Sequence, residues 1–182
     1  VATGGQLLGR DVAPGKILYL QFSAEGKRSE LRQSLERAAV PLDDRIWIYT
    51  GPSVPDPIDA LEAAVAQHRP SLVIIDTLIR WVPVSDANDY SIMSQITENI
   101  ATVARLSGAH IMMLHHAGKA DRDAGDSVLG STAIFGGVDT LLAMRSREGL
   151  RTLESRQRYG DDMEETVLDL DLGTGLLMAA GS

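Results

Sequence analysis

SLVIIDT, residues 71–77, is the stretch that decides the fold of this 182-residue chain. Its four consecutive apolar residues show no polar alternation, which is typical of a strand that is covered on both faces and lies in the middle of a sheet. The strand ends at Asp76 and Thr77, and ligands of open α/β sheets bind beyond the carboxyl ends of the strands. Asp76 is therefore either part of a binding crevice or a plain strand-end cap.

Other apolar runs, each bounded by turn or capping residues, are also predicted to be strands, and helical patterns separate them. Strands that alternate with helices predict a parallel sheet. The run at 111–114 shows no alternation either and is likewise expected to be central. The predicted strands are Ile17–Phe22, Ile46–Tyr49, Leu72–Ile75, Ile111–Leu114 and Val138–Met144. The predicted helices are Lys27–Val40, one that starts at Pro57 after an Asp56 N-cap, and Tyr90–Ser107 with Gly108 as its stop.

From about Arg151 the pattern changes to short strands joined by glycine-containing turns, which predicts an antiparallel extension. These strands are Thr152–Gln157, Thr166–Leu172 and Leu176–Ala179. Repeats and linkers are not evident. We therefore predict one domain over residues 1–182, with an α/β core at 1–150 and a β extension at 151–182.

Composition restricts the function classes. The formal charge of −8 argues mildly against a surface that binds nucleic acid everywhere, and zero Cys excludes disulfides and thiolate metal sites. A hydrophobic share of 44% excludes disorder as the main state. Neither a membrane span nor a secretory signal is evident, so a cytoplasmic protein is expected.

Three further groups of residues could carry chemistry. Glu25 follows a strand and could orient an attacking water, or it is a helix-start carboxylate favoured by the helix dipole. His115 and His116 follow another strand; because adjacent residues point to opposite faces, they cannot easily hold one metal, and one of them is expected to face the crevice. Arg156 and Arg158, spaced by two, could reach an anion on a neighbouring subunit, or they form a solvated strand face.

Gly9–Lys16 superficially resembles a phosphate loop. It has five residues between the glycines, no hydroxyl residue after the lysine and a predicted strand behind it, so we reject it.

In this order the motifs resemble the RecA-like ATPase superfamily, in particular the branch of hexameric replicative helicases of the plasmid RepA type. The resemblance spans nearly the whole chain. It rests on LYL at 18–20 followed by Glu25, on LVIIDTL at 72–78, on LHHAGK at 114–119 followed by DSVLGST at 126–132, and on Arg156-x-Arg158-x-Gly160.

The resemblance implies a mostly parallel sheet flanked by helices, a homo-oligomer, and the use of ATP and Mg²⁺. It also implies roles for individual residues. Glu25 would be the catalytic carboxylate, and Asp76, with Thr77 beside it, would be the Walker B residue that holds Mg²⁺ through water. His115 or His116 would be the sensor of the γ-phosphate. Arg156 and Arg158 would be the arginine fingers.

One departure from the family pattern affects the expected activity. The family's phosphate loop should lie just before Val1, and Val1–Leu8 resembles the end of the helix that follows it. Without that loop and its strand, these residues alone are not expected to form a competent ATPase, whether they are a fragment or a natural derivative. In the family the missing strand lies between those at 111–114 and 138–144, so these two should pair directly or leave two open edges, which predicts an oligomer or a rearranged sheet.

The resemblance also concerns DNA. The loop at 117–126, with Lys119 and Arg122, corresponds to one that touches single-stranded DNA in helicase-like relatives, or it is a mobile surface loop. The predicted function is thus a RecA-like ATPase core related to DNA replication. The alternatives are a non-catalytic module that uses the scaffold for self-association, and an unrelated hydrolase that uses Asp76, Glu25 and His115 on a metal.

Overall fold

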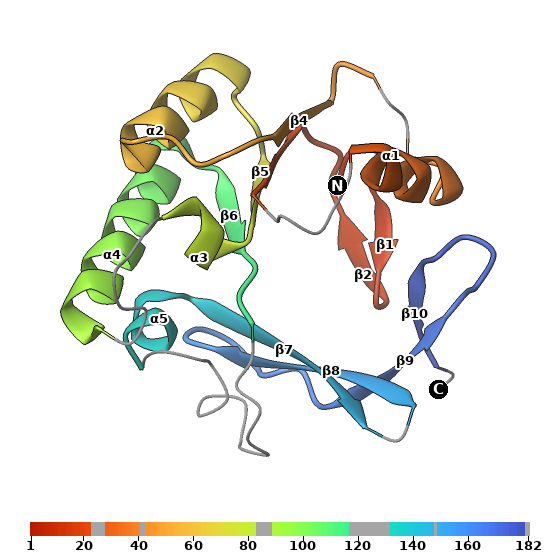
Figure 1. Ribbon diagram of the computed structural model, residues 1–182. Helices are drawn as coiled ribbons and strands as arrows, with labels where there is room; N and C mark the ends of the chain where they lie inside the picture. The colour runs from red at the N-terminus through yellow and green to blue at the C-terminus, as the bar shows by residue number, and fades with distance from the viewer. Residues whose placement is uncertain (23–27, 41–42, 83–88, 117–131, 148, 181–182) are drawn as a thin grey trace.

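Four strands pair in parallel to form the central sheet of this computed structural model, which describes residues 1–22, 28–40, 43–82, 89–116, 132–147 and 149–180 (Figure 1). The strand order is β4-β3-β5-β6, and neighbouring strands are parallel. The strands are β3 (Ile17–Gln21), β4 (Ile46–Thr50), β5 (Leu72–Asp76) and β6 (His110–Met113). Their positions agree with the sequence prediction to within a residue or two.

The core lies between one face of this sheet and two helices, α2 (Pro57–His68) and α4 (Tyr90–Ser107), as Figure 1 shows. Val73 and Ile75 of β5 are completely buried on this face. Burying a side chain of this size stabilises a fold by about 1.5–3 kcal/mol. The other buried members of the cluster are Leu18, Leu20, Leu61, Val65, Leu78, Trp81, Met93, Ile96, Ile100, Val103, Ala109 and Ile134.

The opposite face of the sheet is less covered within the described residues. Ile17, Tyr19 and Ile74 are half-buried there, and Ile48 is exposed. Figure 1 shows helix α1 (Arg28–Arg37) and a small hairpin on this side. The expectation that the 72–75 and 111–114 strands are both central and covered on both faces is therefore wrong in part, because β6 is an edge strand of this sheet. An unbroken apolar run does not reveal how many of its faces are covered.

The helix ends follow their local sequence signals. In α4 the Asp89 carboxylate accepts hydrogen bonds from the N–H groups of Ser91 and Ile92, and Gly108 ends the helix in the left-handed conformation. Asp56 precedes α2, with Pro57 at its first position. α1 is shorter than predicted and has no buried residue. Two short helices, α3 (Leu78–Trp81) and α5 (Thr132–Gly137), complete the helical part of the described ranges.

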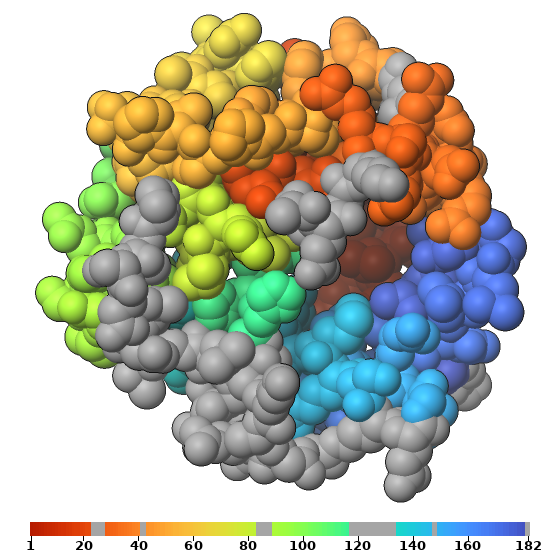
Figure 2. Space-filling model, viewed as in Figure 1, coloured from red at the N-terminus to blue at the C-terminus, as the bar shows by residue number. Residues whose placement is uncertain are grey.

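A second sheet is antiparallel and lies below the first in Figure 1. Its order is β10-β9-β8-β7, from β7 (Thr140–Arg147), β8 (Leu150–Gln157), β9 (Thr166–Leu170) and β10 (Leu177–Ala179). The predicted antiparallel extension is confirmed, but the assignment of the 138–144 strand to the parallel sheet is wrong. That strand pairs with β8 along its whole length because the following segment folds straight back onto it. Figure 2 shows α1 beside the C-terminal strands, where Arg37 Nη2 would lie 3.9 Å from a Cβ atom built on Gly175.

The N-terminal residues form a hairpin of β1 (Gly5–Leu7) and β2 (Arg10–Val12). The expected helix end at Val1–Leu8 is therefore wrong: Gly4, Gly5 and Gly9 all have positive φ, which suits turns and not a helix. The same hairpin contains the first half of the Gly9–Lys16 segment, and strand β3 directly follows that segment, so a strand and not a helix lies behind it, as the sequence predicted.

β6 and β7 do not pair with each other. Each is an edge strand, one in the parallel and one in the antiparallel sheet, as far as the described residues show. Of the two predicted arrangements, direct pairing is wrong, and two edges are left open. Among the helices of the described ranges, none has the length and hydropathy needed to cross a membrane.

Candidate functional site

Two neighbouring strands end side by side at the carboxyl edge of the parallel sheet. β3 and β5 are in register, so that Gln21 lies opposite Asp76. Side chains of paired residues in parallel strands point to the same face, and this face also carries Tyr19, two residues before Gln21. Asp76 is half-buried there. The predicted position of Asp76 at the end of a central strand is thus confirmed.

Tyr19 makes direct contact with Asp76. Its hydroxyl donates a hydrogen bond to Asp76 Oδ2 over 2.7 Å, across 57 positions of sequence. Burial, and then the hydrogen bond to Asp76 and its negative charge, raise the pKa of the Tyr19 phenol above its ordinary value of about 10. The fold therefore favours the neutral phenol.

Stability above pH 10 should depend on this phenol. The contribution of neutral Tyr19 is complete below the pKa of an unfolded tyrosine, near 10, and is lost as the pH rises above that value, because the unfolded chain then releases a proton that the folded chain retains. We expect the free energy of unfolding to fall by up to about 1 kcal/mol per pH unit above pH 10. Urea unfolding at pH 9, 10 and 11 measures the fall. Tyr19→Phe should remove it and Tyr90→Phe, at a 60% exposed position, should not; equal slopes in all three proteins would contradict this account.

The oxygen atoms near Asp76 fit a hydrated magnesium ion. Gln21 Oε1 is buried and accepts no hydrogen bond from the described residues. Within the same residues, the hydrogen bond from Tyr19 leaves Asp76 Oδ1 open. Magnesium retains several waters and uses one or two carboxylates together with substrate phosphates. Among the described residues, no group of three or more His, Cys, Asp or Glu side chains is placed to hold a metal ion.

The next residue, Thr77, caps α3. Its side chain makes no capping hydrogen bond, while its carbonyl oxygen accepts hydrogen bonds from the backbone N–H groups of Arg80 and Trp81. The backbone of Leu114, just after β6, donates to Ile75 and accepts from Leu78. These bonds place the start of the segment that follows β6 beside the start of α3, close to Thr77.

The two histidines differ in exposure, because His115 is half-buried and His116 is exposed. Both follow Leu114, so the structure brings them to the same edge of the sheet as Asp76, as the sequence predicted. Which imidazole faces a bound ligand stays a prediction. The structure places Trp81 in the core, where it is 2% exposed.

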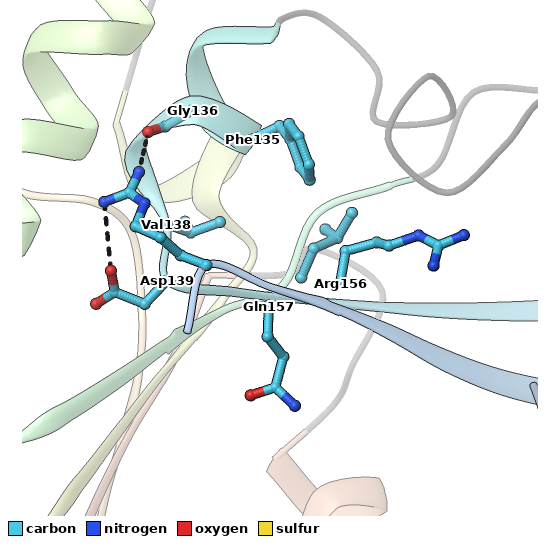
Figure 3. Close-up of a pocket in the computed structure, with 8 residues that line it drawn as sticks. Phe135, Gly136, Val138, Asp139, Arg156 and Gln157 are labelled. Carbon is cyan, nitrogen blue, oxygen red and sulfur yellow. Dashed lines mark hydrogen bonds and ion pairs between the residues drawn. The ribbon is translucent and has the colours of Figure 1, made fainter. Parts of the chain in front are cut away.

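Arg156 lies in β8 of the other sheet and Arg158 directly follows that strand; both line a pocket of about 250 Å³ between α5 and strands β7 and β8 (Figure 3). Arg158 Nη1 pairs with Asp139 Oδ1 at 3.3 Å, and its other terminal nitrogen donates to the Gly136 carbonyl. In Figure 3 Arg156 extends away from Asp139 and Gly136, while Gln157 points to the other side of the strand.

Arg156 instead pairs with Asp162, at 3.1 Å from Nη1 to Oδ2. The N–H of Gln157, and then the Arg156 guanidinium, lower the pKa of the Asp162 carboxyl. Each guanidinium is about half-exposed, so both retain N–H donors toward solvent. The finger role and the solvated-face role both stay predictions.

A sequence profile described as an AAA domain matches residues 1–122. The chain belongs to the AAA domain family. Among solved structures, one described as an ATPase domain is similar, with a TM-score of 0.70 and 13% identity over 91% of this chain and 75% of that one. The RadB recombinase gives a TM-score of 0.62 and 16% identity over 88% and 77% of the two chains. No curated protein sequence is similar enough to count as a match.

These likenesses establish that this AAA domain has a RecA-like fold, as the sequence motifs predicted. The profile match includes the strand that carries Asp76, whereas Arg156 and Arg158 lie beyond it. Glu25, Lys119 and Arg122 lie outside the residues that the structure describes, so their roles stay predictions.

Sequence reasoning on this AAA domain missed Tyr19 and Gln21. The signal is present, because both are polar residues at period-2 positions in an otherwise apolar strand, and so share one face. What the sequence could not show is that this face adjoins Asp76.

Proposed function

We propose that this chain is the ATPase core of a DNA-directed motor, in which Asp76 helps to hold a magnesium–nucleotide complex. The observation that supports this most is the place of Asp76 at the carboxyl edge of a RecA-like parallel sheet, with one of its oxygens held by Tyr19. Crevices at that edge are where open α/β sheets bind their ligands.

Each candidate residue would have its own role in binding or hydrolysing the nucleotide. Asp76 Oδ1 and Gln21 Oε1 would accept hydrogen bonds from the waters of the ion, and Glu25 would orient the attacking water. His115 or His116 would sense the terminal phosphate, and Arg156 and Arg158 would contact the nucleotide of a neighbouring subunit. Bound magnesium would supply charge neutralisation on the phosphates. Lys119 and Arg122 would touch single-stranded DNA.

Nucleotide binding by these 182 residues alone should be weak. The sequence contains no G-x-x-x-x-G-K-[ST] motif, whose backbone N–H groups and lysine hold the β- and γ-phosphates in P-loop proteins. With Asp76 and the ion as the main contacts, we expect a Kd for Mg·ATP of about 1 mM or weaker, which corresponds to about −4 kcal/mol.

The test is an NMR titration of the amide resonances with Mn·ATP, whose paramagnetic ion broadens nearby signals. We expect broadening centred on Gln21, Asp76 and Thr77, and its loss in Asp76→Asn. Asp59→Asn, in the exposed first turn of α2, is the matched control and should behave as the wild type. Binding in the micromolar range would contradict the expected weak affinity, and broadening that Asp76→Asn leaves unchanged would contradict the proposed site.

A second candidate function is a non-catalytic module that assembles through its own strands. The edges of β6 and β7, which pair with no further strand among the described residues, favour it, as do Leu142 and Met144 of β7, which are 48% and 52% exposed. Light scattering on the same samples separates the two candidates. An oligomer without metal-dependent nucleotide binding supports the assembly module, and a metal-dependent site around Asp76 supports the ATPase core.

A further inference from the structure

The hydrogen bond between Tyr19 and Asp76 joins the two middle strands of the parallel sheet at their functional edge. β3 is paired on both sides, with β4 and β5, so its backbone is held in place. The phenol reaches Asp76 Oδ2 over 2.7 Å, which is a normal length for a hydrogen bond to a carboxylate. A contact of this kind can serve the fold, the carboxylate, or both.

We propose that Tyr19 is a positioning residue for Asp76: it holds Oδ2 and so presents Oδ1 to a hydrated magnesium ion, an inference that rests on the function proposed above. The χ2 torsion of an aspartate is broad and has no deep minima, so an unsupported carboxylate rotates readily. A phenol on a fixed strand restricts that rotation. Groups that hold a metal-binding carboxylate commonly change metal affinity by 10- to 100-fold when they are removed.

A second polar side chain on the same face supports this assignment. Gln21 Oε1 is buried without a donor among the described residues, at the register position opposite Asp76. An ion-bound water between Oδ1 and this oxygen would satisfy both acceptors.

The test compares Tyr19→Phe with the wild type and with Tyr90→Phe, which removes a hydroxyl from an exposed position. At a fixed, high ATP concentration, Mg²⁺ is titrated while the amide signals of Gln21 and Asp76 are followed by NMR. We expect the Mg²⁺ concentration at half-saturation to rise about tenfold in Tyr19→Phe and to stay unchanged in Tyr90→Phe. ATP binding in the presence of EDTA should be the same in all three proteins.

A role in the fold alone predicts something else. Tyr19→Phe would then be less stable to urea but would keep the wild-type Mg²⁺ dependence, and this result would overturn the proposal while leaving the Asp76 site intact. If the wild type itself shows no Mg²⁺-dependent change at Asp76, the proposed function fails, and the positioning role fails with it. The two failures are thus distinguishable in one titration.

A second measurement keeps the Tyr19 hydroxyl group in place, in case Tyr19→Phe does not fold. The four tyrosines are replaced by 3-fluorotyrosine, and the Tyr19 signal is assigned by elimination with Tyr49→Phe, Tyr90→Phe and Tyr159→Phe. Mg·ATP should shift the ¹⁹F resonance of Tyr19, and Asp76→Asn should abolish that shift. A Tyr19 resonance that does not respond to Mg·ATP, while the Asp76 amide does, would overturn the proposal.

Discussion

Replacing Trp81 with alanine is expected to lower the free energy of unfolding by about 4 kcal/mol. Trp81 is 2% exposed and is the largest of the fully buried side chains, at the end of α3. Its loss removes a large apolar surface and leaves a cavity that the sheet and α4 cannot fill by relaxing. Its carbonyl oxygen also accepts a hydrogen bond from Ser53 Oγ, so the backbone of Trp81 is fixed as well as its side chain.

Urea denaturation followed by far-ultraviolet circular dichroism measures this loss. The matched control is Trp47→Ala, at the other tryptophan of the chain. Trp47 is half-buried, and its ring lies 4.7 Å from the His68 ring and 5.3 Å from Lys16 Nζ, at the rim of the core. We expect its loss to cost about half as much. Equal losses for the two tryptophans would mean that the core is not centred on Trp81.

Gly137→Ala is expected to be the second most damaging change, at about 2–3 kcal/mol. A Cβ atom at this position would overlap Thr97 Cγ2 and would lie 2.9 Å from Thr97 Cβ. Thr97 cannot yield easily, because it is 1% exposed and its hydroxyl donates to the Met93 carbonyl over 2.7 Å. The absence of a side chain on Gly137 is what allows α5 to pack directly on α4.

Two further variants test whether the contact with Thr97 causes this loss of stability. Gly136→Ala, one residue earlier, meets nothing within 4 Å and should be neutral or slightly stabilising, as alanine usually is in a helix. Thr97→Ser removes the clashing methyl group and keeps the hydroxyl, so the double variant with Gly137→Ala should lose less than the sum of the single changes. Thermal unfolding of the wild type and the four variants tests both points, and simple additivity of the Gly137→Ala and Thr97→Ser effects would refute the proposed clash.

Local signals predict most of the secondary structure. The ends of α4 follow from an aspartate that caps the first turn and a glycine that ends the last, and both act within a few residues of the helix. The apolar runs of β3, β4 and β5 are likewise visible in the sequence, because a buried strand must be apolar wherever it pairs. Asp76 is recognisable as a candidate site residue for the same reason, as a carboxylate that directly follows such a run.

Pairing partners could not be predicted in the same way. The 138–144 run is equally apolar whether it joins the parallel sheet or, as β7, pairs with β8. The contact of Tyr19 with Asp76 depends on strand order and register, which bring together residues 57 positions apart. The acidic partner of Arg156 lies in the turn after β8, and that of Arg158 directly precedes β7, so neither pair is visible before the strands are placed.

The two sheets differ in how far along the chain their partners lie, and this difference bears on how the protein folds. β7 and β8 pair residues as close as Arg147 and Leu150, so their hairpin closes a very short loop. β5 must find β3, with Leu72 opposite Ile17, and the closure of that long loop costs more chain entropy. We therefore expect the antiparallel sheet to form early and the edge that holds Asp76 to be completed late, since contacts that are distant in sequence form slowly.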